Sequence, residues 1–191
     1  AMELIPGTTL QHRIEAGSLE YKDVVDIGLQ IAEALRASTR FDIVHGDIKP
    51  SNILLGEGLA KLSDFGLAQR LSRRDGESGR IAGTPNYMAP EVCRGEPATA
   101  QSDMYSFGVM LFEMTFGRLP YNFDEASIQS RLEAHQGAPV EFPDSWPAET
   151  PESWRPFLEK LLAKSPGDRF ASWDELIETL RQLQPLNPVP A

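Results

Sequence analysis

The chain has 191 residues, a length that fits one domain with a substantial buried core. Its 28 acidic residues outnumber its 18 basic ones, and the net charge of −10 argues against nucleic acid or an anionic membrane as the main partner. Cys93 is the sole cysteine of the sequence, so no intramolecular disulfide forms and a reducing compartment is expected.

A cytoplasmic location is predicted from the absence of membrane and export signals. Residues 1–10 lack the basic and apolar regions of a secretory signal peptide. The longest apolar stretch, residues 104–116, is interrupted by Glu113 and is too short to span a bilayer. A cytoplasmic domain of a membrane-tethered protein fits these observations equally well.

Apolar periodicity predicts a mainly helical chain. Residues 21–37 place apolar side chains along one helical face, and residues 102–116 are apolar enough for a buried helix that Gly117 ends. Ser172, followed three residues later by Glu175, is the signature of a capping box. The predicted helices cover residues 10–14, 21–37, 102–116, 124–136, 156–164 and 172–183.

Other segments have the composition of strands or connections. Residues 51–62 contain two short apolar runs around Gly56-Glu57-Gly58, which predicts a β-hairpin. Residues 67–83 are polar and rich in Arg, Ser and Gly, as loops are, and residues 138–151 form a proline-rich connection. Residues 184–191 carry three prolines and are expected to be a tail or a linker.

The most informative motif is the run His45–Asn52 (HGDIKPSN), followed by Asp64-Phe65-Gly66. It sets carboxylates, an amide and a lysine at a spacing suited to holding metal-bound phosphate beside a hydroxyl nucleophile. Asp-Phe-Gly alone is weak evidence, because the tripeptide occurs by chance in many proteins. Its simplest interpretation is then a turn after a strand. Further signatures follow in order, however: GTPNYMAPE at 83–91, SDMYSFGV at 102–109 and DRF at 168–170.

With these signatures in this order, residues 2–183 resemble the C-terminal lobe of a eukaryotic-type serine/threonine protein kinase. The resemblance implies a mainly α fold: a helical bundle around a central buried helix, with small β-hairpins carrying the catalytic and metal loops. Residues 1–183 would form this lobe, with 1–9 as the hinge and 64–91 as the activation segment. Residues 184–191 would lie outside it.

The resemblance implies the roles of the catalytic residues. Asp47 would accept the proton of the substrate hydroxyl, and Lys49 would neutralise the γ-phosphoryl group of ATP. Thr84 would hydrogen-bond both of them. Asn52 and Asp64 would ligate Mg²⁺ and so bind the nucleotide through the metal. Lys49 and Thr84 also favour serine and threonine over tyrosine as substrates.

Adenine binding is assigned to the start of the chain and to an apolar column. Met2 matches the gatekeeper, and Glu3 to Ile5 match the hinge strand whose backbone would bond adenine. Leu54 belongs to the apolar column beneath the adenine. The column's other members are Leu10, Met110 and Met114. Ordinary core packing is the alternative explanation for each member of the column, and in this family both explanations hold at once for Met110 and Met114.

Two further contacts implied by the resemblance are structural. Asp103 would accept backbone N–H groups near His45 and Gly46, and His45 would be structural rather than a general base. Phe65 would join His45 and Asp103 in the second column that aligns the catalytic machinery. Glu91 and Arg169 would form a buried ion pair.

Gly46 stands where the family usually has an arginine, so the resemblance implies a kinase of the non-RD type. That arginine normally pairs with a phosphorylated activation loop. We therefore hypothesise that activity does not depend on phosphorylation of Ser72 or Ser78 in the usual way. The arginines at 70, 73, 74 and 80 are alternative partners, although a solvated basic loop is the simpler interpretation. Thr9 and Ser51 are not acidic, so a strong preference for arginine at the corresponding substrate positions is not expected.

The 191 residues contain neither a G-x-G-x-x-G loop nor a V-A-I-K-like strand. We therefore expect ATP to bind weakly and the chain alone to be inactive. Its expected partners are a protein substrate, the missing N-terminal lobe and, through the apolar seam that this lobe would cover, a second copy. The alternative is a natural half-kinase that binds partners through residues 124–136 or the seam, without catalysis. Phosphorylation of small molecules is disfavoured by Ala89-Pro90-Glu91.

Overall fold

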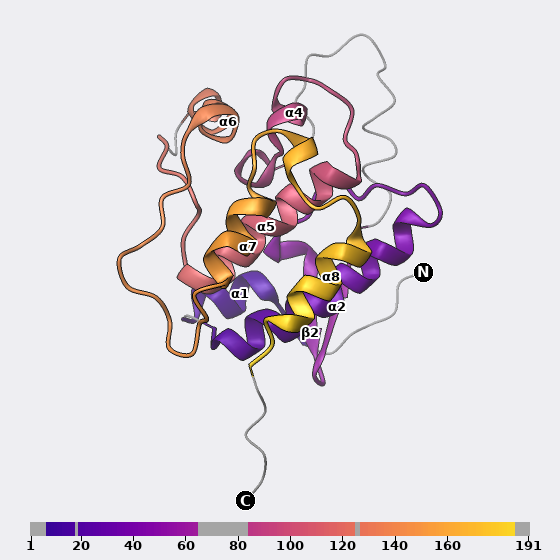
Figure 1. Ribbon diagram of the computed structural model, residues 1–191, viewed down its shortest axis with the longest axis vertical. Helices are drawn as coiled ribbons and strands as arrows, with labels where there is room; N and C mark the ends of the chain where they lie inside the picture. The colour runs from indigo at the N-terminus through magenta and orange to yellow at the C-terminus, as the bar shows by residue number, and fades with distance from the viewer. Residues whose placement is uncertain (1–6, 18, 65–83, 125–126, 186–191) are drawn as a thin grey trace, which may run out of the picture.

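The computed structural model describes residues 7–17, 19–64, 84–124 and 127–185. The described chain is mostly helical and includes one three-stranded antiparallel sheet (Figure 1). Its α-helices are α1 (Leu10–Glu15), α2 (Tyr21–Thr39), α4 (Pro90–Cys93), α5 (Ala100–Phe116), α6 (Ile128–Gly137), α7 (Trp154–Leu161) and α8 (Trp173–Gln182). Among the described residues, none of the helices is both long enough and apolar enough to cross a membrane.

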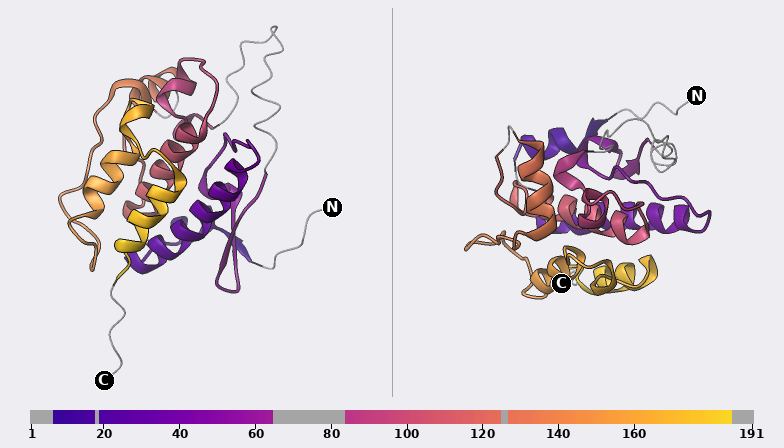
Figure 2. Two further views of the ribbon diagram at one scale, coloured as in Figure 1. Left: turned by 45° about the vertical axis from the view of Figure 1, so that its right-hand side comes forward. Right: turned by 90° about the horizontal axis from the view of Figure 1, so that it is seen from above.

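Helix α5 is the centre of the bundle. Most of its side chains are buried, including those of Tyr105, Phe107 and Phe112. Figure 2 shows α7 and α8 as an outer layer beside α2 and α5, and α2 also packs against α8. The expectation of a mainly helical fold around a buried helix in this region is confirmed.

The ends of α5 follow from its capping residues. The Thr99 hydroxyl accepts the N–H of Ser102, and the Ser102 hydroxyl accepts the N–H of Thr99. This capping box starts the helix at Ala100, two residues before the predicted start. Gly117 ends the helix as predicted, with a φ of 67° that favours glycine.

The other predicted helices are present with shifted ends. Helix α7 begins at Trp154 rather than at Pro156, because proline is tolerated in the first turn, where N–H groups have no helical partner. Helix α6 begins at Ile128 rather than at 124, with the Ser127 hydroxyl accepting the N–H of Ser130. The short helix α4 was not predicted.

The capping box predicted at the start of α8 is present in a modified form. The Ser172 hydroxyl accepts the N–H of Glu175, as expected. The Glu175 carboxylate, however, accepts the N–H of Ala171, one residue before the position that the motif predicts.

The predicted hairpin is formed by β2 (Ile53–Gly56) and β3 (Leu59–Leu62), with Ile53 opposite Leu62. A third strand that was not predicted, β1 (Thr8–Thr9), pairs with the other edge of β2. The Gln30 side chain of α2 accepts the N–H of Ala60 at 2.8 Å and so ties the sheet to the helices. Short 3₁₀ turns lie at Pro50–Asn52, Pro85–Tyr87 and Pro166–Asp168.

Candidate active site

The His45–Asn52 loop lies between α2 and β2 and is anchored by a buried carboxylate of α5. Asp103 Oδ2 accepts the N–H of His45 and Oδ1 accepts the N–H of Gly46, both at 2.8 Å. Burial raises the pKa of Asp103 to about 6, while the two N–H donors and His45 act to lower it. The carboxylate is therefore largely ionised at neutral pH, and the predicted contact is confirmed.

Gly46 has a φ of 74°, in the left-handed region that favours glycine. An L-residue with a side chain pays about 1–2 kcal/mol for this conformation. Glycine thus relieves a local strain that the arginine usual at this position would carry. The departure from the motif therefore has a backbone explanation.

His45 is fully buried and uses both ring nitrogens. Nε2 lies 2.9 Å from the carbonyl oxygen of Ser63, and Nδ1 accepts the N–H of Asp47 at 3.3 Å. A carbonyl partner requires a proton on Nε2, and an N–H partner requires a lone pair on Nδ1. The ring therefore links the Ser63 carbonyl to the backbone of the catalytic loop, in agreement with a structural role.

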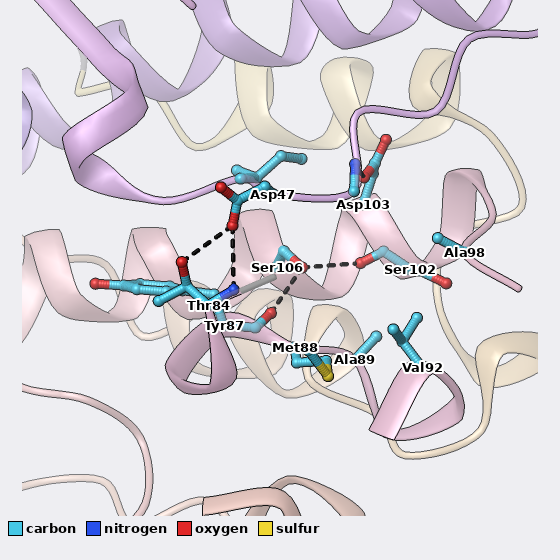
Figure 3. A pocket seen from close by; sticks show the side chains of 12 residues that line it. Asp47, Thr84, Tyr87, Met88, Ala89, Val92, Ala98, Ser102, Asp103 and Ser106 are labelled. Carbon is cyan, nitrogen blue, oxygen red and sulfur yellow. Dashed lines mark hydrogen bonds between the residues drawn. The ribbon is translucent and has the colours of Figure 1, made fainter. Parts of the chain in front are cut away.

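Asp47, Lys49 and Thr84 form one connected group. Lys49 Nζ lies 2.6 Å from Asp47 Oδ2 and donates to Thr84 Oγ1, also at 2.6 Å. The Thr84 hydroxyl and backbone N–H both donate to Asp47 Oδ1, at 3.1 and 3.2 Å (Figure 3). Both hydrogen bonds that the sequence predicted for Thr84 are present.

The charge state of Asp47 follows from these contacts. Burial alone would raise the pKa of its carboxyl group, but the hydrogen bond and charge of Lys49 outweigh it, with help from Thr84 and Asn52. The net result is a lowered pKa. Asp47 is therefore an ionised carboxylate at neutral pH, held in place by three neighbouring side chains.

Asn52 and Asp64 offer side-chain oxygen atoms of the kind that ligate a magnesium ion. The buried Asn52 amide nitrogen donates to Asp47, to the carbonyl oxygen at 2.8 Å and to Oδ2 at 3.2 Å. The amide oxygen is therefore the atom that can ligate a cation. Asp64 is exposed and has a φ of 62°. Mg²⁺ usually takes one or two carboxylates together with phosphate oxygens and water, so this pair suits it.

The described segment from Thr84 onward packs on α5 through side chains that the sequence analysis did not single out. Tyr87 donates its hydroxyl proton to Glu113 Oε2 at 2.6 Å. The Ser106 hydroxyl donates to the Tyr87 carbonyl oxygen at 2.7 Å (Figure 3). Their signal was the spacing along α5, since Ser102, Ser106 and Glu113 lie on the side of the helix that faces this segment.

A small hollow of about 20 Å³ lies between the catalytic loop and this segment. Asp47, Thr84, Tyr87 and Ser106 are among the residues that line it (Figure 3). Nucleotide-sized ligands need pockets of about 300–1,000 Å³. The hollow is therefore a gap between packed loops and does not hold a nucleotide.

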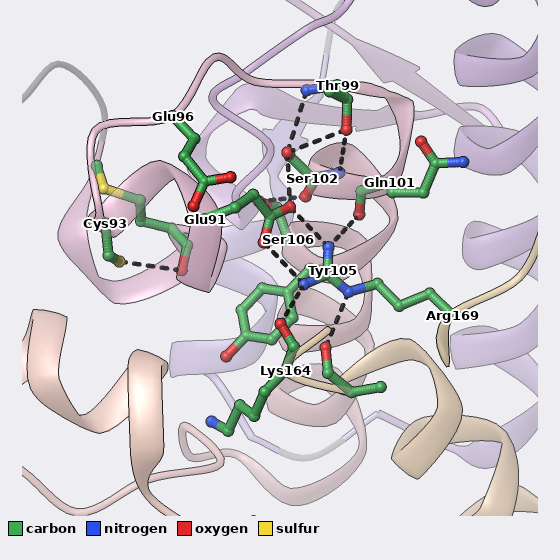
Figure 4. A network of polar contacts seen from close by, with 12 residues as sticks. Glu91, Cys93, Glu96, Thr99, Gln101, Ser102, Tyr105, Ser106, Lys164 and Arg169 are labelled. Atoms are coloured by element: carbon green, nitrogen blue, oxygen red, sulfur yellow. Dashed lines mark hydrogen bonds and ion pairs between the residues drawn. The ribbon is translucent and has the colours of Figure 1, made fainter. Parts of the chain in front are cut away.

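Glu91 and Arg169 form the predicted buried ion pair. Arg169 Nη1 and Nη2 donate to Glu91 Oε1 and Oε2, at 2.8 and 2.9 Å (Figure 4). Arg169 also donates to the carbonyl oxygens of Gln101 and Ala163, and the Ser102 hydroxyl donates to Glu91. Burial raises the pKa of Glu91, but these donors outweigh it and the net pKa is lowered.

The residues assigned to adenine binding are only partly described. Met2, Glu3, Ile5 and Phe65 lie outside the described residues, as do 65–83 with the loop serines and arginines. Leu54 is half-buried in β2, between two neighbours, Ile53 and Leu55, that pack into the core. Because strand side chains alternate, Leu54 faces the other side of the sheet. The remaining members of the column, Leu10, Met110 and Met114, are buried in the core.

Comparison with known proteins identifies relatives over most of the chain. The sequence profile of the family described as "Protein kinase domain" matches residues 1–180. Serine/threonine-protein kinase PrkC of Bacillus subtilis is 36% identical over 178 residues, 92% of this chain and 27% of its own length. Serine/threonine-protein kinases PknA of Corynebacterium glutamicum is 35% identical over 178 residues, 92% of this chain and 37% of its own.

A probable serine/threonine-protein kinase of Clostridium acetobutylicum is similar to 96% of this chain, with 31% identity over 186 residues. The match covers 28% of that relative's length. The chain thus spans about a quarter to a little over a third of the curated relatives that it matches.

Proposed function

We propose, since this chain belongs to the protein kinase domain family, that it is the C-terminal lobe of an ATP-dependent serine/threonine protein kinase. The parent protein would transfer a phosphoryl group from ATP to serine or threonine hydroxyls of a protein substrate. The observation that carries the proposal is the contact of Asp47 with both Lys49 and Thr84. The half-buried Asp47 carboxylate is ionised at neutral pH, so it can accept a hydrogen bond from a substrate hydroxyl, and the lysine beside it places positive charge where a phosphoryl group would lie.

In this mechanism Asp47 orients the attacking hydroxyl and takes its proton. Lys49 balances negative charge, first on Asp47 and then on the phosphoryl group as it moves between oxygens. Thr84 holds the two side chains in one geometry and comes from the segment next to which the substrate would lie. No covalent intermediate on the protein is required.

Asn52 and Asp64 would hold Mg²⁺ through their side-chain oxygens. When bound, the metal neutralises the phosphate charge that the reaction develops. The chain's own contribution is to hold these two oxygens beside the catalytic group, since Asn52 also donates to Asp47. Protonation of Asp47 would therefore impair both its acceptance of the substrate proton and its hydrogen bond with Asn52.

ATP binding needs more than this lobe provides. Met2, Glu3 and Ile5 would bond adenine and Leu54 would lie beneath it, but a glycine-rich loop and an anchoring lysine are absent from the 191 residues. We therefore propose that the chain alone is inactive and that an N-terminal lobe completes the nucleotide site. The parent's catalytic domain would act in the cytoplasm.

The test compares the parent protein with the 191-residue chain. The parent should transfer labelled phosphate from Mg²⁺-ATP to a generic protein substrate on serine or threonine. Its Asp47→Asn variant should be at least 100-fold slower. The chain alone should transfer none. An inactive parent with intact Asp47, Lys49, Asn52 and Asp64 would favour the alternative, a binding or scaffolding module that acts through residues 124–136 or the apolar seam.

Gly46 also carries a regulatory proposal, which is that activity does not require the usual phosphate on the activation segment. An arginine would pair with that phosphate, and glycine has no side chain to do so. Treating the parent protein with a phosphatase should leave most of its activity intact. Loss of most activity would refute this part of the proposal and leave the catalytic assignment standing.

A further inference from the structure

Ser63 joins the two residues that would hold the metal. It lies at the end of β3, immediately before Asp64, and opposite Asn52 in a continuation of the β2–β3 register. Its N–H donates to the Asn52 carbonyl oxygen at 2.8 Å. Its side-chain oxygen lies 2.9 Å from that same carbonyl oxygen and 3.4 Å from Asp64 Oδ2.

The backbone contact is independent of the side chain, because any residue other than proline would donate it. The hydroxyl contact is specific to this residue, since only serine or threonine places an oxygen there on so short a stem. The hydroxyl has one proton. At 2.9 Å the Asn52 carbonyl is within hydrogen-bond range, whereas 3.4 Å to Asp64 is long for an O–H donor. The proton is therefore engaged mainly with Asn52.

Ser63 is also fixed from the opposite side. Its carbonyl oxygen lies 2.9 Å from Nε2 of the fully buried His45. His45 in turn accepts the N–H of Asp47. The N–H, the carbonyl and the hydroxyl of Ser63 thus each contact a part of the catalytic loop, and Asp64 is the next residue along the chain.

We propose that the Ser63 hydroxyl is a positioning group that sets the separation of Asn52 and Asp64 and so prepares them to bind one divalent cation. The hydroxyl fixes the loop carbonyl of one ligand to the strand end that carries the other. Without it, the backbone N–H of Ser63 alone holds the Asn52 carbonyl at this point, so the two ligands are less firmly ordered and binding of the cation must supply the remaining order, which weakens it. The inference rests on the proposed metal-binding function of the two ligands.

The test uses the whole 191-residue chain and Mn²⁺ alone as the probe. Paramagnetic broadening of NMR signals reports weak metal binding residue by residue and needs no enzymatic activity. In the wild-type chain, the Asn52 side-chain amide and the Asp64 amide should broaden together as Mn²⁺ is added. In Ser63→Ala, about three- to tenfold more Mn²⁺ should be needed, the effect of losing one hydrogen bond. The two signals should also respond at different concentrations.

Two variants serve as controls. Ser63→Thr keeps the hydroxyl and should restore the wild-type response. Ser38→Ala removes a matched contact outside the proposed site, since the buried Ser38 hydroxyl of α2 donates to the Leu35 carbonyl at 2.8 Å. It should leave the Mn²⁺ response unchanged. A structural effect of losing any serine hydroxyl would appear in both alanine variants.

The outcomes separate this inference from the function on which it rests. If the wild-type chain shows no broadening at Asn52 and Asp64, the proposed metal site is wrong. If the wild type responds and Ser63→Ala responds identically, the site stands and the role of Ser63 is refuted. Joint broadening that weakens in Ser63→Ala and returns in Ser63→Thr supports both.

Discussion

Arg169 holds Glu91 by two parallel hydrogen bonds although the two residues lie 78 positions apart in the chain. Both side chains are almost completely buried, at 0% and 3% exposure. The pair therefore joins the segment that ends at α4 to the turn that precedes α8. Arg169 also donates to the carbonyl oxygens of Ala163 and Gln101, so it holds backbone groups as well as Glu91 in place.

We predict that Arg169→Met lowers the free energy of unfolding by about 3–5 kcal/mol, because Glu91 is left as an unpaired buried charge. Urea denaturation of the variant measures this loss. The exposed pair of Arg94 and Glu96 provides the control, and Arg94→Met should cost less than about 1 kcal/mol. Equal losses in the two variants would contradict the prediction. The double variant Glu91→Met/Arg169→Met should recover part of the stability.

Gly108 in α5 is predicted to be intolerant of a methyl group. A Cβ atom at this position would lie 2.7 Å from Leu161 Cβ of α7, closer than packed carbon atoms approach. Gly108→Ala should therefore destabilise the fold by about 1–3 kcal/mol, as overpacking of a core does. Gly137→Ala is the matched control, because nothing lies within 4 Å of the added atom. A stable Gly108→Ala chain would show that α5 and α7 move apart easily.

Removing the Lys49 charge should raise the pKa of Asp47. Lys49 is the main cause of the lowering, and the burial that remains acts to raise it. In Lys49→Met, the carboxyl signal of Asp47 in a ¹³C NMR titration should move to higher pH. A signal that titrates at the wild-type pH would mean that Thr84 and Asn52 alone hold the carboxylate.

The same contact predicts a pH dependence of stability. A carboxylate whose folded pKa lies below its unfolded value stabilises the fold above the unfolded pKa, and this is lost as pH falls through the folded pKa. At neutral pH, the free energy of unfolding of the wild-type chain should therefore be larger than that of the Lys49→Met variant. The difference should shrink below pH 3.8, the ordinary value for Asp, as the carboxyl group of Asp47 becomes protonated. Denaturation at several pH values measures the gap.

Lys164 should make a second pH-dependent contribution to stability, at alkaline pH. Burial lowers its pKa to about 8, and the nearby Arg169 contributes. Between pH 8 and 10.5 the unfolded chain therefore binds more protons at this residue than the folded chain, so stability at this site rises with pH. Relative to Lys164→Met, the wild-type chain should gain stability across this window. If the difference in free energy of unfolding between the wild-type chain and Lys164→Met stays constant across this window, Lys164 keeps an ordinary pKa.

Part of the molecule could be predicted because the information is local. The helical period of residues 21–37, the apolar run that became α5 and the glycine turn of the hairpin each lie within a short window, and their elements are present. Boundaries moved wherever a cap decided them, as Thr99 did at α5 and Ser127 did at α6. Strand β1 was missed because two residues carry no periodic pattern and only pairing with β2 makes them a strand.

The motif residues of the site were recognisable for the same reason, since His45 to Asn52 are contiguous. Ser63, Ser106 and Glu113 were missed as contributors because their importance comes from partners that are distant in sequence. Ser106, for example, matters because the carbonyl of Tyr87, 19 residues away, lies against it. The spacing of Ser106 and Glu113 along α5 puts them on one side of the helix, but it does not identify the distant segment that this side contacts.

The sequence by itself determined the family, the mainly helical class and the set of groups available for phosphoryl transfer, because these depend on residue types at fixed local spacing. Only the tertiary structure decided how those groups are coupled. Ser63 contacts Asn52, 11 residues away, and His45, 18 residues away, while Ser106 of α5 holds the carbonyl of Tyr87 in the segment that follows Thr84. Packing around α5 sets these distances, and packing depends on the whole folded chain.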